Sequence, residues 1–219
     1  GFLVSDEKGR AFAGLGARLE GGASIADRDY FREHQSLAER RLLVFGPTMG
    51  RFSKHWIMVL SRAYRYPDGR FAGVVNASVP VRNLASQFAQ IDLGPHGSVV
   101  LRNTAQALIA RFPVVEGGRG QVGDSAVSKD FSAMAESGVK EGNFHTLQAP
   151  DGYERSYAFR RVGDLPLILT LGKAPQDYFE LWKQERRNTV LFLFVFFLFS
   201  MLGAWFVQRV WRQRMEGFA

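Results

Sequence analysis

The sequence predicts an α+β fold in which two tandem antiparallel sheets, each flanked by helices, are followed by one transmembrane helix. Three observations predict it. A strand-turn-strand, helix and hairpin order occurs twice along the chain, with only slight sequence identity between the two halves, so the repeat is one of architecture. Each half contains a hairpin signal with an Asp-Gly turn, at 68–69 and at 151–152. An uncharged apolar segment, residues 189–208, then approaches the carboxyl end.

The first half carries a strong hairpin preceded by a short helix. Asp-Gly supplies the positive φ of a tight turn, and the flanking runs are rich in β-branched and aromatic residues. Asp27 is the expected N-cap of the helix. The expected elements are, in order, a strand from Phe2, a turn at 6–9, a strand through Phe12, a Gly-rich loop at 14–23, a helix from Asp27, a short strand at 42–45 stopped by Gly46-Pro47, strands at 56–64 and 71–79, and a helix from Val81.

The second half repeats this order with different residues. Its Gly-rich stretch at 116–125 lacks the Lys-Ser/Thr ending of a phosphate loop and is interpreted as a loop. The expected elements are a strand pair around a turn at 103–104, a short helix at 130–137 ended by Gly138, a hairpin around 151–152, a final apolar strand at 165–174 and a helix at 177–188. We expect this last helix to continue without a break into the apolar segment.

The apolar segment is long enough to cross a bilayer as a helix. A buried core helix is the alternative, but soluble helices of this length usually keep a polar face. Trp205 and Trp211 lie near its second boundary, where indoles favour the membrane interface. Three Arg follow the segment closely, at 209, 212 and 214, and slightly outweigh Arg186, Arg187 and Lys183 before it. The positive-inside rule therefore predicts a cytoplasmic carboxyl end and places residues 1–188 outside.

Composition argues against several classes of function. The 28 Lys and Arg exceed the 21 Asp and Glu by 7, but they are scattered and form no basic arm, so nucleic acid is not an expected partner. With no cysteine, thiol catalysis and thiolate metal sites are excluded. The four His show no metal-ligand spacing, and no hydrolase or phosphate-loop motif is present. We therefore expect no metal, no cofactor and no enzymatic activity in this segment. Because no signal peptide is visible, we expect that an earlier membrane helix precedes these residues.

Four stretches carry a resemblance to a known family. They are DRDYFREH at 27–34, LSRAYRYPDGRFAGVVNASV at 60–79, IDLGPHGSVVLRN with ALIARFP at 91–113, and DGYERSYAFRRVGDLPLILTLGKA at 151–174. In this order, and followed by a membrane helix, they resemble the double Cache (tandem PAS-like) extracytoplasmic sensor domains of bacterial membrane receptors. The resemblance is to those that precede diguanylate cyclase or histidine kinase modules, and it covers residues 1 to about 175.

The resemblance implies an organisation and a function. It implies a membrane-distal PAS-like domain at 1–88 that lacks its amino-terminal helix, a membrane-proximal one at 89–176, a connecting helix at 177–188, the transmembrane helix at 189–208 and the start of a cytoplasmic segment at 209–219. It further implies a homodimer in the bacterial inner membrane. The distal domain would bind a small metabolite and signal to a cytoplasmic output, for which we expect a diguanylate cyclase, with a histidine kinase as the alternative. The family's amino-acid-binding pattern of Tyr, Arg, Trp, Tyr and Asp is not found, so the resemblance does not extend to an amino-acid ligand.

By this resemblance the helix holding DRDYF and the following hairpin wall the ligand pocket. Arg28 is the best anchor for a carboxylate, since a guanidinium can hold both oxygens near the positive end of a helix. The alternative is a surface ion pair with Asp27 or Asp29. Tyr30 and His34 lie one turn apart and could close the same wall, or be a core and a solvated residue.

The hairpin supplies the remaining candidates. Trp56 and Arg62 share one strand face with Met58 and Leu60, while Val59 and Ser61 share the other. Asn76 and Ser78 share a face of the return strand and would line a cavity or face solvent. A different class of function also stays open, a membrane-anchored protein-interaction module with no small-molecule ligand.

Overall fold

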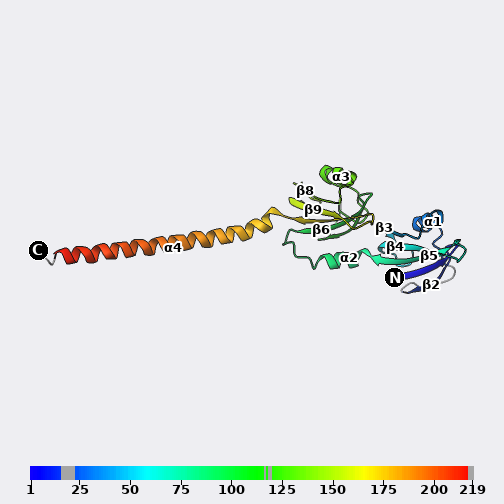
Figure 1. Cartoon of the computed structure of the whole chain (residues 1–219), viewed down its shortest axis with the longest axis horizontal. Coiled ribbons are helices and arrows are strands. Elements are labelled where there is room, and N and C mark those ends of the chain that lie inside the picture. The colour runs from blue at the N-terminus through cyan, green and yellow to red at the C-terminus, as the bar shows by residue number, and fades with distance from the viewer. Residues whose placement is uncertain (16–22, 116, 118–119, 217–219) are drawn as a thin grey trace. The chain divides into compact units, whose positions relative to one another are not determined.

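A computed structural model describes residues 1–15, 23–115, 117 and 120–216 of the chain, which divide into two compact units, Gly1–Ala174 and Pro175–Ala219. The first unit contains two five-stranded antiparallel sheets with short helices, and the second is one long helix (Figure 1). This is the α+β architecture that the sequence predicts. The boundary at residue 88 between two domains stays a prediction, because both sheets belong to one compact unit.

The first sheet has the strand order β2-β1-β5-β4-β3. Its elements are β1 (Phe2–Asp6), β2 (Ala11–Leu15), α1 (Asp29–Ser36), β3 (Leu42–Met49), β4 (Trp56–Arg65) and β5 (Phe71–Pro80), and α2 (Val81–Phe88) follows. The β4–β5 hairpin turns where predicted, with Gly69 at φ +87° and Asp68 accepting a hydrogen bond from the backbone N–H of Arg70. Part of the predicted loop at 14–23, residues 16–22, lies outside the described residues.

Two local predictions in this sheet are wrong. The strand β3 does not stop at Gly46-Pro47, because pairing with β4 resumes at Thr48 after a register shift. Proline removes one ladder donor, and a bulge absorbs the interruption. Asp27 is not the N-cap of α1: the extended residue Arg28 occupies that position without a side-chain capping bond. The carboxylate of Asp27 is instead paired with Arg51.

The second sheet repeats the first in the same spatial order, β7-β6-β10-β9-β8. Its elements are β6 (Ser98–Asn103), β7 (Leu108–Phe112), α3 (Lys129–Glu136), β8 (Glu141–Thr146), β9 (Arg155–Arg161) and β10 (Leu167–Lys173). Helix α3 begins at a regular N-cap, Ser128, whose Oγ accepts from the N–H of Phe131 at 3.2 Å. In chain order each sheet is therefore a strand pair, a helix and three strands, and the predicted architectural repeat is confirmed.

Each sheet packs its own helix on one face. In the first sheet, Tyr30 and Phe31 of α1 pack with Ile57, Val59 and Val74. In the second, Phe131 of α3 packs with Phe159 and Ile168. The opposite faces meet α2 in a shared cluster of buried residues, Met58, Val81, Leu101, Ile109, Ala110 and Leu167. A hydrogen bond from Asn103 Nδ2 to the carbonyl of Gly46, at 2.9 Å, also joins the two sheets.

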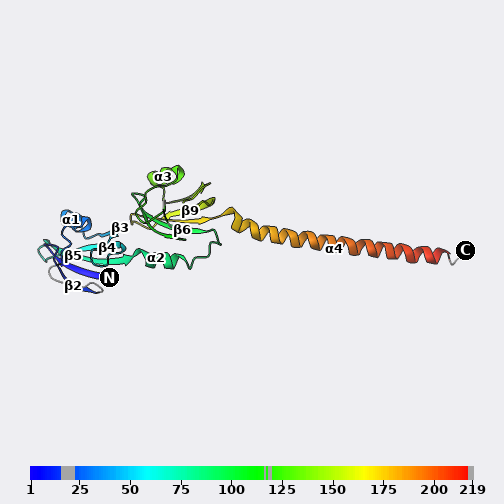
Figure 2. The same cartoon turned by 180° about the vertical axis from the view of Figure 1, so that it is seen from behind.

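The second unit is the helix α4 (Pro175–Glu216), which runs for 42 residues, or about 63 Å at the usual rise. Figure 2 shows it unbroken from end to end. Within Glu185–Arg209, the most apolar window of 18 residues has a mean hydropathy of 2.6, and none of that window is buried in the structure. The helix is thus long and apolar enough to cross a membrane. The predicted continuity between the helix at 177–188 and the apolar segment is confirmed.

Candidate functional site

A cavity of about 100 Å³ lies between α1, the end of β3 and the face of the first sheet that α1 covers. Alternation along the strands decides which side chains reach it. Asn76 and Ser78 of β5 pair with Ser61 and Val59 of β4, so all four residues share this face. The cavity is lined by Arg28 and Tyr30 from the start of α1, Arg51 from the turn after β3, and Asn76 and Ser78 from the sheet, among apolar neighbours.

The inner part of the cavity carries a polar group without a partner. Asn76 is 4% exposed, and its side-chain Nδ2 has no hydrogen-bond partner among the described residues. A buried amide left unpaired costs about 1–3 kcal/mol, so such groups are uncommon unless a ligand or water completes them. Its neighbour in the register on β4, Ser61, is also buried. The floor of the cavity can therefore donate a hydrogen bond to a bound molecule.

Two guanidinium groups lie at the same cavity. Arg28 donates from Nη2 to the carbonyl of Met49 at 3.1 Å, which draws the start of α1 toward the end of β3. Arg51 donates from Nη1 to the carbonyl of Ser24 at 2.5 Å and pairs through Nη2 with Asp27. That hydrogen bond lowers the pKa of the Asp27 carboxyl, so the pair is ionised at neutral pH. With two arginines and one carboxylate, this site favours an anion.

Tyr30 lines the cavity from α1 and is mostly buried. Its ring lies 5.9 Å from that of Phe45, and burial raises the pKa of its hydroxyl, which stays neutral. Both predicted descriptions of Tyr30 thus hold together, since it belongs to the core and also borders the cavity.

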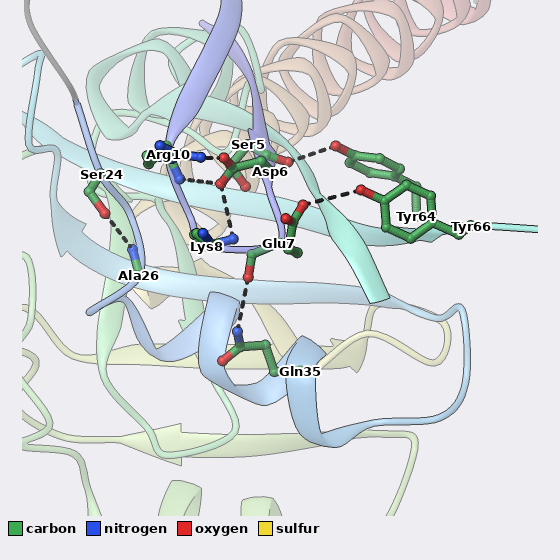
Figure 3. A network of polar contacts seen from close by, with 10 residues as sticks. All are labelled: Ser5, Asp6, Glu7, Lys8, Arg10, Ser24, Ala26, Gln35, Tyr64 and Tyr66. Carbon is green, nitrogen blue, oxygen red and sulfur yellow. Dashed lines mark hydrogen bonds and ion pairs between the residues drawn. The ribbon is translucent and has the colours of Figure 1, made fainter. Parts of the chain in front are cut away.

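His34 does not line the cavity, although it lies one turn after Tyr30. It is fully buried, with Nε2 at 3.1 Å from the Oγ of Ser61, so the alternative of a solvated histidine is wrong. Next to it, Gln35 donates to the carbonyl of Glu7, whose carboxylate accepts from Tyr66 at 3.2 Å (Figure 3). These contacts fasten the end of α1 to the β1–β2 turn and to β4. His34 therefore holds the helix in place.

Trp56 and Arg62 lie on the opposite face of β4 from the cavity. Trp56 is 40% exposed and borders a different cavity, of about 630 Å³, together with Val81 and Arg82. Arg62 is exposed, and its Nε donates to the carbonyl of Arg40 at 3.3 Å. The prediction that the Trp56 and Arg62 face of this strand meets α1 is wrong. Both faces of the strand are rich in apolar residues. Alternation alone cannot tell which face meets the helix.

Arg51 is the second charged residue on the cavity lining, and it was not predicted from the sequence. It stands in a polar turn between two strands, and nothing in RFSKH distinguishes it from a solvated turn residue. Among the described residues, no group of three or more His, Asp or Glu could hold a metal ion.

No family model matches the chain, and no curated protein matches it. Solved structures do. The extracellular domain of the inferred histidine kinase rpHK1S-Z16 is 27% identical, with a TM-score of 0.70 over 80% of this chain and 70% of that one. The ligand-binding domain of the Campylobacter jejuni chemoreceptor Tlp3, in complex with L-norvaline, is 14% identical, with a TM-score of 0.53 over 79% of this chain and 64% of that one.

A third neighbour is the ligand-binding domain of the Pseudomonas fluorescens chemoreceptor CtaA in complex with L-leucine. It is 13% identical, with a TM-score of 0.54 over 80% of this chain and 70% of that one. All three neighbours are sensor or ligand-binding domains and not catalytic domains. At such low identity the two chemoreceptors indicate a common fold, and the present chain spans less than two thirds of the Tlp3 domain. The chain therefore has the fold of these extracellular sensor and ligand-binding domains, which is consistent with the double Cache sensor domain that its sequence resembles.

Proposed function

We propose that this chain is the extracytoplasmic sensor of a membrane-bound signal-transduction protein, and that the cavity beneath α1 binds a small carboxylate. The observation that carries the proposal is the buried Nδ2 of Asn76, which has no hydrogen-bond partner in the part of the chain that the structure describes; Asn76 lines a cavity together with Arg28 and Arg51. A carboxylate would accept from the amide and from a guanidinium together, and charge-assisted bonds of this kind are the strong ones.

The volume of the cavity limits the size of the ligand that it can hold. A volume of about 100 Å³ holds roughly three water molecules, whereas pockets for larger ligands usually exceed about 300 Å³. The chemoreceptor neighbours were solved with L-norvaline and L-leucine. For the present chain the volume favours a shorter acid of about three to six heavy atoms, such as acetate, propionate or lactate.

Signalling requires that the ligand bind two conformations with different free energies. The cavity joins the start of α1 to β5, which leads directly into α2, so closure on a ligand would act on the sheet. Helix α4 follows β10 without a flexible linker between them that would absorb a displacement of the sheet. A dimer would allow two such helices to report relative motion. The 27% identical neighbour belongs to an inferred histidine kinase, which supports a histidine kinase output as the alternative to the diguanylate cyclase expected from the resemblance.

The direct test measures thermal unfolding of the whole chain in nanodiscs with acetate, propionate and lactate. A true ligand raises the unfolding free energy by RT ln(1 + [L]/Kd), about 2.7 kcal/mol at one hundred times Kd. Acetamide and propionamide, which lack the charge, are expected to give no shift. The variant Arg28→Ala should lose the ligand-induced shift, while its unliganded stability falls by no more than about 1.5 kcal/mol, the usual value of one hydrogen bond.

Arg32→Ala provides the matched control, since Arg32 lies exposed on the same helix and does not line the cavity. It should keep the full shift. If no acid stabilises the protein, the interaction-module alternative is favoured. If the shift survives Arg28→Ala, the acid binds elsewhere and the assignment of this cavity is wrong.

A further inference from the structure

A larger cavity, of about 410 Å³, lies beneath α3 on the second sheet. It occupies the position in the second repeat that the cavity beneath α1 occupies in the first, between the helix and the sheet face that this helix covers. Val100 and Arg102 of β6 and Thr170 of β10 form part of its floor. Val100 pairs with Thr170, and Arg102 lies two residues further along the same strand face.

Buried arginines dominate the charge of this region. Arg155 is fully buried and Arg111 nearly so, and both bond to the same carboxylate, Asp151, at 2.6–2.7 Å. Arg102 is also buried; burial lowers the pKa of its guanidinium, and the nearby charge of Asp124 only partly opposes this. Among the described residues, Arg111 and Arg155 therefore share the single carboxylate of Asp151, while Arg102 lies near that of Asp124 without an ion pair to it. A bound anion would balance the remaining positive charge, which is costly to bury.

Arg102 lines the cavity directly, and its bonds are to neutral acceptors. Its Nη1 donates to the carbonyls of Gln106 at 2.5 Å and Asp124 at 2.7 Å, and Nη2 approaches that of Ala126 at 3.4 Å. Burial lowers the pKa of this guanidinium to about 10, which still leaves it fully charged at neutral pH. These carbonyl contacts hold the charge in a fixed position, so an incoming anion meets an ordered partner.

Three aromatic side chains also line the cavity. Phe144 stacks on Tyr157, with ring centroids 4.8 Å apart and planes 7° from parallel, and Phe131 of α3 lies 5.6 Å from Phe144. All three residues line the cavity. Rings arranged in this way present both faces and edges to a further ring, which is the geometry that aromatic pairs prefer.

Thr146, at the end of β8, adds a hydroxyl group to the cavity. It lines the cavity, and its Oγ1 is buried without a hydrogen-bond partner among the described residues. A ligand oxygen placed between Thr146 and the arginines would complete this group. The cavity thus offers a charged end, an aromatic wall and an unpaired hydroxyl.

We propose that the cavity beneath α3 is a second ligand site, which binds an aromatic monocarboxylate. Its volume lies in the range of established small-molecule pockets, about four times that of the cavity beneath α1. The carboxylate faces Arg102 and Arg111, and the ring lies among Phe131, Phe144 and Tyr157. The site is independent of the proposed short-chain site and takes a different class of acid.

The test uses benzoate, phenylacetate and 3-phenylpropionate as probes, measured by calorimetry on the whole chain in nanodiscs. We expect at least one acid to bind saturably, and its neutral amide to bind at least about tenfold more weakly, as expected for the loss of charge-assisted bonds. Ala126→Trp, at an exposed position on the cavity lining, should weaken binding at least about tenfold by filling the space. Ser125→Trp, next to it but not on the lining, should leave binding unchanged.

Thr146→Val separates binding from folding. It removes the unpaired hydroxyl at nearly constant volume, so the unliganded melting temperature should stay equal or rise while the acid binds several-fold more weakly. Arg28→Ala should leave aromatic-acid binding intact, because Arg28 belongs to the other cavity. Absence of binding by all three acids, or binding that is insensitive to Ala126→Trp, would overturn this proposal. Loss of acetate or lactate binding alone would instead count against the cavity beneath α1.

Discussion

His34 is a buried histidine, and its imidazole helps to hold α1 against the sheet. Burial lowers its pKa, so the folded state keeps the ring neutral at a pH where the unfolded chain has already bound a proton. The ring is fully buried against Ser61, which leaves no room for solvent to relieve the charged form. Mild acid should therefore loosen the same helix that borders the cavity.

The sign of this effect follows from the direction of the shift. Above about pH 6.5 His34 is neutral in both states and contributes no pH dependence. As the pH falls from there toward the lower folded pKa, the unfolding free energy decreases, with a limiting slope of about 1.4 kcal/mol per pH unit. Chemical denaturation between pH 5 and 8 measures this slope. His34→Gln should flatten it below pH 6.5, whereas His145→Gln, at an exposed position, should not.

Single residues of the cavity were partly predictable from the sequence. Asn76 and Ser78 stand out as polar residues at alternate positions of an apolar strand, and both line the cavity. Arg28 also lines it, as the resemblance implies. Whether these residues bind a ligand stays a prediction. Arg62 shows the limit of such reasoning, because an isolated charge in an apolar strand turned out to be an exposed residue bonded to a backbone carbonyl.

At the scale of elements, the two hairpin turns illustrate how similar sequences acquire different roles. Both have Asp-Gly, and both turns were predicted. Asp68 forms an exposed pair with Arg70 beside it. Asp151 instead joins its turn to two strands, through Arg111 of β7 and Arg155 of β9. The sequence could not show this second role, because Arg111 lies 40 residues away along the chain.

Asp151 should be far more important for stability than its counterpart. Burial alone would raise the pKa of its carboxyl, but the hydrogen bonds from Arg155 and the charge of Arg111 outweigh this and lower it. Asp151→Asn leaves two buried guanidinium groups without a counter-charge, which costs about 3–5 kcal/mol. Equilibrium unfolding in urea measures the loss. Asp68→Asn is the matched control and should change stability little; comparable losses in both variants would mean that the buried cluster is not a special contribution.

Some element boundaries follow from local sequence, and others depend on distant residues. The hairpins, α2 and α3 follow from local turn chemistry and apolar periodicity, which the sequence displays directly. The extension of β3 beyond Pro47 depends on its partner β4, which restores the pairing at Thr48 and Ile57. The start of α1 at Asp29 likewise depends on tertiary contacts, since Arg51 takes the carboxylate of Asp27 that would otherwise cap the helix. Both predictions were wrong because contacts with residues distant in the sequence set these two boundaries.

At the scale of the whole molecule, the repeat of one architecture gives two cavities of different character. The smaller, beneath α1, suits a short acid, while the larger, beneath α3, combines arginines with aromatic rings. Helix α4 follows the last strand and carries the apolar segment Glu185–Arg209. A sensor function requires that this apolar segment cross the membrane and that both sheets stand on its extracytoplasmic side.

Membrane topology tests this claim most directly, and the absence of native cysteine makes it simple to measure. Asp68→Cys places a thiol at an exposed turn of the first sheet, and Trp211→Cys places one beyond the apolar segment. Each variant of the whole protein is expressed in bacterial cells, and spheroplasts are treated with a membrane-impermeant maleimide. We predict labelling of position 68 in intact spheroplasts and of position 211 only after permeabilisation. Labelling of position 68 only after permeabilisation would contradict an extracytoplasmic sensor.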